Sequence, residues 1–267
     1  MEAITLHAIA DQIALVTLNR PDRLNAIDGS FLDAMDGVLD QLSDATKWRV
    51  AIITGAGRGF CSGADRSGAG AAWTPPSTHA YKTMWDAQCR LTDQLTRLYE
   101  LPIPTIAAIH GAAVGGGLAL ALHCDIRLAQ SDARFASAFL TAGFSSMDMG
   151  TSYLLPKIVG VGAARELMLT GRIIDSRTAL ELGLVSRVID QTAVLDTALE
   201  LANEIAANNP YGVWQTKVGL NTALDSSSLR HAKELENRIQ VMSLFTENPR
   251  EAGQAFIERR PPVWETL

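Results

Sequence analysis

The spacing of hydrophobic and polar positions changes several times along the chain, and each change marks an expected element. Residues 4–9 and 13–18 are rich in Ile, Leu and Val on either side of a polar Asp-Gln pair, which predicts a β-hairpin. Residues 29–46 carry apolar side chains at helical spacing. Residues 49–54 form an apolar run typical of a buried strand, and a glycine-rich loop follows at 55–63.

The same order of strand, glycine loop and helix then returns. A helix is expected at 81–100, a strand at 105–110, a helix at 117–124 and a strand at 125–129. This repetition favours a stacked α/β spiral over one open sheet. Between the two units, residues 64–80 are rich in Gly, Ala and Pro without any period, which predicts a mobile loop.

Helices are expected at 162–170 and 176–182, followed by a strand at 184–189. After residue 190 no further strand pattern occurs. Further helices are expected near 192–207, 211–224, 228–246 and up to 258. We therefore expect a core at 1–195 and a helical region at 196–267, which would pack on a partner subunit.

Composition narrows the class of protein. The 267 residues are 47% hydrophobic, enough for a large core. A net charge of −6 argues against a nucleic-acid-binding surface. The N-terminus lacks a signal-peptide pattern, and the longest apolar run is interrupted by glycines and a histidine, which disfavours a membrane span. Three cysteines without a paired framework favour the reducing cytoplasm.

Gly115, Gly116 and Gly117 form the most informative cluster, because they stand between an expected strand and an expected helix. Glycines allow close backbone approach, and the first turn of a helix leaves N–H groups without an intrahelical acceptor. Such N–H groups bind anions, or an oxygen that gains negative charge during a reaction.

Three other motifs give weaker evidence for a function. The glycines at 55, 57 and 59 lack the third glycine of a dinucleotide-binding loop, since Phe60 stands there. Cys61 lies in a Gly-x-Cys-x-Gly run, but the strand and helix of a nucleophile elbow do not flank it directly. His123, Cys124 and Asp125 are adjacent residues that no second cluster completes, so no metal site is expected.

Asp148 allows two interpretations. It precedes an expected helix and could be the N-cap of that helix. Alternatively, it is a carboxylate in an apolar loop, with a pKa raised toward use as a base.

Six segments together resemble the enoyl-CoA hydratase/isomerase (crotonase) superfamily, in the family's order and over nearly the whole chain. They are residues 18–27, 60–65, 110–117 with 124–127, 166–172, 179–188 and 256–262. The resemblance implies a crotonase-like spiral of ββα units with a C-terminal helical region that assembles trimers or dimers of trimers. It also implies an acyl-CoA thioester substrate, with coenzyme A as part of the substrate and no separate cofactor.

The matching positions assign expected roles. Backbone N–H groups of Ala64 and Gly116 would form an oxyanion hole for the thioester oxygen. The expected coenzyme A path runs along Arg23, Ala26, Ser62, Asp65 and Arg66, and Phe256 and Arg259 would reach a neighbouring subunit's coenzyme A.

The chain departs from the family where hydratases carry two glutamates, since Ala119 and Phe139 stand at those positions. These two residues and Gly143 are instead expected to line an apolar acyl pocket. Asp148 falls where some members, such as 4-chlorobenzoyl-CoA dehalogenase, carry a catalytic aspartate, although that enzyme's helper histidine and tryptophan are not matched.

Three functions stay open at this point. Asp148 could be a single acid/base for isomerisation or hydration, or a nucleophile for hydrolysis or dehalogenation. The chain could also be a scaffold that binds acyl-CoA without chemistry.

Overall fold

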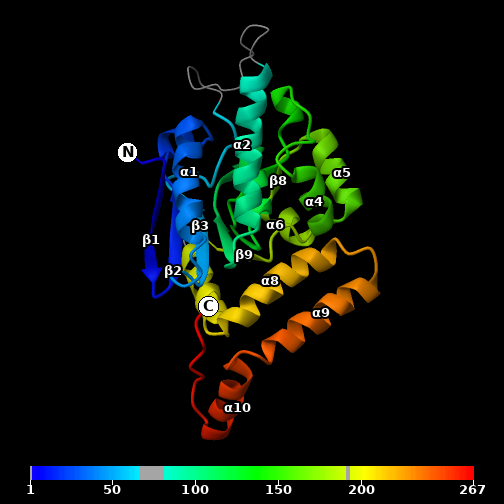
Figure 1. The fold of residues 1–267 in the computed structure, drawn as a ribbon. Helices are drawn as coiled ribbons and strands as arrows, with labels where there is room; N and C mark the ends of the chain where they lie inside the picture. Colours follow the sequence, from blue (N-terminus) through cyan, green and yellow to red (C-terminus); the bar gives the residue numbers. More distant parts are fainter. Residues whose placement is uncertain (1, 66–80, 191–192) are drawn as a thin grey trace.

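Two β-sheets form the centre of the molecule in the computed structural model, which describes residues 2–65, 81–190 and 193–267 (Figure 1). The loop expected at 64–80 lies almost wholly outside these residues. The larger sheet has the order β1 (Ile4–Ala10), β2 (Ile13–Leu18), β3 (Val50–Gly55), β4 (Thr105–Ile109), β6 (Ile126–Gln130) and β9 (Arg187–Ile189). The smaller sheet has the order β5 (Ala112–Val114), β7 (Arg134–Ala136) and β8 (Ile174–Asp175).

Pairing in the sheets agrees with the expected stacked units. The β1–β2 pair is antiparallel, as expected for a hairpin, and the other pairs of the large sheet are parallel. An isolated bridge between Cys61 and Ala113 joins the loop after β3 to the smaller sheet. The expectation of stacked units rather than one open sheet is therefore confirmed.

The helices occur where they were expected, with shifts of a few residues at their ends; the one after Asp148 was expected from its position alone and not from apolar spacing. They are α1 (Gly29–Leu42), α2 (Tyr81–Tyr99), α3 (Gly116–Leu122), α4 (Thr151–Val159), α5 (Val161–Thr170), α6 (Ser176–Glu181), α7 (Val194–Ala206), α8 (Pro210–Leu224), α9 (Leu229–Ser243) and α10 (Asn248–Glu258). Single 3₁₀ turns lie at Pro21–Arg23 and Leu140–Ala142.

Successive residues of a strand point to opposite faces of the sheet, so the apolar strands present side chains on both faces. Both faces of the large sheet are covered by other elements. One face packs with α1, α2, α3 and the smaller sheet in the larger hydrophobic cluster. The other face buries Ile52 and Ile106 against Ala198 and Ala202 of α7. The expected boundary between 195 and 196 thus falls inside α7, a helix that covers the sheet.

Helices α8, α9 and α10 form an arm that extends from the core, with α10 farthest away (Figure 1). Lys217 of α8 attaches the arm to the core, since its ammonium group lies 2.8 Å from the Asp125 carboxylate and donates to the Ile103 carbonyl at 3.0 Å. No residue of α9 is buried.

Candidate functional site

The glycine cluster lies where α3 touches the segment after β3. Gly115 is the N-cap of α3 with a φ of 55°, a left-handed conformation that favours glycine. A Cβ on Gly117 would lie 2.0 Å from the Cys61 carbonyl oxygen, so only glycine permits this approach. Hydrogen bonds from Cys61 N to Ala112 O at 2.8 Å and from Val114 N to Cys61 O at 3.0 Å hold the two segments together.

Two backbone N–H groups stay free at this junction. Ile27 N donates to Gly63 O at 2.8 Å and Asp65 N donates to Ile27 O at 2.9 Å, so the Ala64 N–H between them takes no part in the pairing. Gly116 is the first residue of α3, whose N–H has no intrahelical acceptor. Within the described chain, neither N–H donates to an acceptor.

The two donors belong to segments in direct contact. A Cβ on Gly63 would lie 3.1 Å from the Gly116 nitrogen and 2.7 Å from the Val114 oxygen. Gly63 adopts a φ of 90°, which turns the chain into this contact. Paired N–H donors fixed before a substrate arrives are what stabilises a developing oxyanion.

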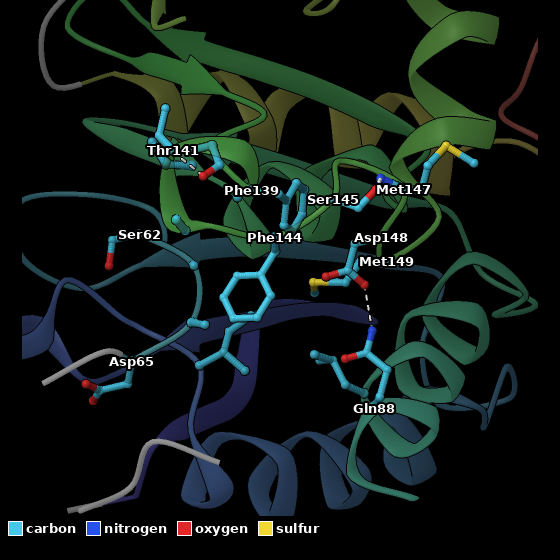
Figure 2. A pocket seen from close by; sticks show the side chains of 18 of the residues that line it. Ser62, Asp65, Gln88, Phe139, Thr141, Phe144, Ser145, Met147, Asp148 and Met149 are labelled. Atoms are coloured by element: carbon cyan, nitrogen blue, oxygen red, sulfur yellow. Dashed lines mark hydrogen bonds between the residues drawn. The ribbon is translucent and has the colours of Figure 1, made fainter. Parts of the chain in front are cut away.

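A pocket of about 730 Å³ opens beside these segments (Figure 2). Ser62, Gly63, Ala64, Val114 and Gly115 line it on the donor side. Most other lining side chains are apolar or aromatic: Ile27, Tyr81, Met84, Trp85, Leu91, Phe139, Phe144, Met147 and Met149. Such a lining suits a hydrophobic ligand group held next to a few polar atoms.

Asp148 lies in the pocket wall and accepts a hydrogen bond from Gln88 of α2, with Nε2 and Oδ1 2.6 Å apart (Figure 2). Burial raises the pKa of Asp148 above its ordinary value of 3.8, and hydrogen bonds from Gln88 and from the Met149 backbone partly oppose the rise. A half-buried carboxyl with a raised pKa can both accept and return a proton.

Asp65 is the other carboxylate among the described lining residues, and its surroundings differ. Arg20 lies 3.1 Å from Asp65 and 2.6 Å from Asp28, forming a partly buried ion-pair group. Its guanidinium also donates to the Ala26 carbonyl. Asp65 is thus engaged with a cation, whereas none of the described cations contributes to the environment of Asp148.

The structure brings together most of the site residues expected from the sequence. Ala64, Ser62, Asp65, Phe139 and Asp148 line the pocket, and Gly116 adjoins it. The loop that carries Arg23 and Ala26 lies beside the donor segment, since Ser62 N donates to Leu24 O at 3.0 Å.

Other expected residues lie elsewhere. Ala119 does not line the pocket, because α3 turns its side chain into the core, where it is fully buried. Gly143 also does not line it, although its neighbours Ala142 and Phe144 do. Phe256 and Arg259 lie on or just after α10, remote from this chain's pocket (Figure 1). Arg66 lies outside the described residues.

The structure also tests the helix-cap, nucleophile and metal-site interpretations of the sequence. The N-cap of α4 is Gly150, not Asp148, and the Asp148 side chain turns to Gln88 instead. Cys61 is fully buried and burial raises its pKa to about 12, so its thiol is unsuited to nucleophilic attack. Among the described residues, no group of His, Cys, Asp and Glu could hold a metal.

Sequence reasoning missed Gln88, Phe144 and the Tyr81–Trp85 pair, whose ring centroids lie 6.2 Å apart. Phe144 projects into the middle of the pocket, with Asp148 and Gln88 to one side of it in Figure 2. Gln88 sits on the polar stretch of an amphipathic helix, and no motif distinguishes it there from solvent-facing residues.

No helix of the described part of the chain is long and apolar enough to cross a membrane.

Known proteins resemble this chain over nearly its whole length. The family model for enoyl-CoA hydratase/isomerase matches residues 8–266. "Probable enoyl-CoA hydratase EchA12" of Mycobacterium tuberculosis is 39% identical over 259 residues, covering 95% of this chain and 89% of the relative. The 1,2-epoxyphenylacetyl-CoA isomerase of Escherichia coli is 32% identical, covering 98% of each chain.

Solved structures extend the agreement to the fold. The crystal structure of an enoyl-CoA hydratase from Bacillus anthracis superposes with a TM-score of 0.91 at 30% identity, covering 98% of each chain. The two-sheet α/β architecture is thus the crotonase fold. The chain belongs to the enoyl-CoA hydratase/isomerase family.

Proposed function

We propose that this protein is an enoyl-CoA isomerase in which Asp148 is the single acid/base. The thioester oxygen of the substrate binds to the N–H groups of Ala64 and Gly116, and the acyl group occupies the apolar part of the pocket. The observation that carries this proposal is the environment of Asp148: a pocket carboxyl with a raised pKa and with no cationic partner among the residues that the structure describes.

A proton shift needs no second acid/base group. Asp148 takes a proton from Cα of a 3-enoyl thioester, and the electron pair moves to the thioester oxygen to give a dienolate. The two N–H donors stabilise that negative charge. The same carboxyl group then returns the proton to Cγ, and the double bond ends between Cα and Cβ.

Hydration makes a larger demand, because one group must activate water while another protonates Cα. Fully buried Ala119 offers no such group, and Phe139 offers only an aromatic ring. Gln88 is a neutral amide and cannot replace a carboxyl group as an acid. These features favour isomerisation over hydration by two carboxyl groups.

Asp148→Asn tests the assignment directly. We expect kcat for 3-enoyl-CoA to fall by roughly 10²- to 10⁴-fold, the range for loss of a general acid/base. Asp86→Asn is the matched control, because Asp86 lies on α2 in an exposed ion pair with Lys82 and does not line the pocket. Unchanged turnover by Asp148→Asn would refute the role.

Labelled water separates the remaining alternatives. Isomerisation with exchange places solvent deuterium at Cα or Cγ and leaves the Asp148 carboxylate unlabelled. A nucleophilic role for Asp148 would instead introduce oxygen-18 from water into that side chain over repeated turnover. Tight binding of acyl-CoA with no turnover on a broad thioester panel would indicate a non-catalytic scaffold.

The arm formed by α8, α9 and α10 supports a second part of the proposal, assembly into trimers or dimers of trimers. Its large apolar side chains are exposed in the single chain, including Leu229 at 77%, Phe245 at 81% and Phe256 at 85%. Large exposed apolar side chains concentrated on one arm are typical of an interaction surface. Neighbouring copies would cover it and bring Phe256 and Arg259 toward an adjacent coenzyme A.

A further inference from the structure

We propose that Gln88 is a positioning residue that holds one oxygen of Asp148 through both of its protonation states. Oδ1 stays bonded to the Gln88 amide, and Oδ2 is left to exchange the proton with the substrate. This role rests on the proposed function of Asp148 as the acid/base.

The geometry is that of a short, strong contact. Gln88 Nε2 and Asp148 Oδ1 lie 2.6 Å apart, slightly closer than the ~2.7–2.9 Å of charge-assisted N–H···O hydrogen bonds. Figure 2 shows the Gln88 side chain extending from α2 toward Asp148, with both groups lining the same pocket. No other side chain of the described residues hydrogen-bonds the Asp148 carboxylate.

The helix that carries Gln88 is firmly anchored just beyond it. Leu91, Leu95 and Leu98 are buried, and Gln94 Nε2 donates to the Leu32 carbonyl at 2.7 Å. Arg90 adds ion pairs to Asp33 at 2.8 Å and to Asp36 at 2.7 Å on α1. Gln88 stands one turn before Leu91, so this anchoring fixes the place of its amide group.

An amide is suited to a carboxyl group that gains and loses a proton. Its N–H donates to Oδ1 of the carboxylate, and it can donate to the same oxygen, then the carbonyl oxygen of the acid, once Oδ2 carries the proton. A lysine or arginine at this place would put a positive charge beside the carboxyl group, which would favour its ionised form and lower its pKa.

The other groups around Asp148 do not duplicate this arrangement. The Met149 N–H is a backbone donor and is fixed. Asp65, on the donor segment, is paired with Arg20, and Tyr81 lines the pocket at the start of α2. The imidazole of His123 packs against Gly150 on the far side of the loop, and burial lowers its pKa.

Removal of the amide should change the titration of Asp148 rather than the binding of substrate. Gln88→Met keeps the length of the side chain and loses the donor. Because a hydrogen bond to the charged form lowers a pKa, we expect the acid limb of log(kcat/KM) against pH to move up by about one pH unit. We expect kcat at neutral pH to fall several-fold while KM changes by less than a factor of two.

Gln88→Glu is the second variant, since it has the same shape and cannot donate when ionised. Two adjacent carboxylates repel each other, so the pair holds its first proton to a higher pH than a single carboxyl group does. The acid limb of this variant should therefore also lie at higher pH than that of the unmodified protein. Thr92→Val is the control, because the Thr92 hydroxyl bonds only to carbonyls of α2 and does not line the pocket. Its pH profile should be unshifted.

The inference is overturned if folded Gln88→Met and Gln88→Glu both keep the acid limb of the unmodified protein. It is also overturned if Thr92→Val moves the limb as far as they do, since the shift would then reflect general disturbance of α2. If either of these results occurs and Asp148→Asn is inactive, Gln88 has no positioning role but Asp148 remains the proposed acid/base. An active Asp148→Asn would remove the proposed function itself.

Discussion

Gly117→Ala is the sharpest test of the oxyanion-hole geometry, because it changes no ionisable group and no lining side chain. The added Cβ would lie 2.0 Å from the Cys61 carbonyl oxygen and 2.7 Å from its carbonyl carbon. Both neighbours are backbone atoms, so no flexible side chain can turn aside. The start of α3 and the Cys61–Ala64 segment must therefore move apart.

The size of that movement sets the expected loss. Real Cβ atoms do not approach heavy atoms closer than 3.0 Å, so a separation of 2.0 Å requires a displacement of about 1 Å. A misplacement of about 1 Å can reduce a rate by roughly 10²-fold, similar to the loss of one oxyanion donor. We therefore expect kcat to fall about 10²-fold, equivalent to about 3 kcal/mol of transition-state stabilisation.

The assay compares kcat and KM with 3-enoyl-CoA, alongside urea unfolding. Overpacking of this kind should reduce the free energy of unfolding by about 1–3 kcal/mol, leaving a folded protein to measure. Gly37→Ala in α1 is the control, because an added Cβ there meets nothing within 4 Å. A folded Gly117→Ala protein with the kcat of the unmodified protein would refute the oxyanion-hole geometry.

Three further outcomes follow from features outside that contact. Lys217→Met should lower the free energy of unfolding by about 3 kcal/mol in urea titrations, because it leaves partly buried Asp125 without its cation; a loss under about 1 kcal/mol would contradict this. The stability of Asp148→Asn relative to the unmodified protein should increase as pH rises above 3.8, because ionisation of a group whose pKa is raised in the folded state weakens that state. Thermal melts of both proteins from pH 3 to pH 8 measure this difference. A difference that does not change with pH would contradict the prediction. Phe245→Ser should shift sedimentation toward smaller species, and an unaltered profile would exclude this residue from the subunit interface.

The sequence was sufficient for most of the large sheet and most of the helices, because their apolar spacing persists over five or more residues. It did not reveal the smaller sheet, whose strands have two or three residues each, too few for a period to be recognised. The glycine cluster was recognisable as a charge-stabilising motif, and the structure adds that Gly117 is required by the Cys61 carbonyl.

The environment of Asp148 shows where sequence reasoning ends. A cap and a base are equally compatible with its position before a helix, and only the structure shows that its side chain turns to Gln88, sixty residues earlier. Ala119 shows the opposite case: the substitution at a family position was visible, but the turn of α3 that buries its side chain was not.

The bridge between Cys61 and Ala113 also has a consequence for how the protein acquires activity. The Ala64 and Gly116 donors lie some fifty residues apart in the chain, and they meet only when the two sheets dock. Formation of such distant contacts is slow compared with local helix formation. During refolding, recovery of turnover should therefore lag behind recovery of helical circular dichroism, making enzymatic activity a late reporter of native structure.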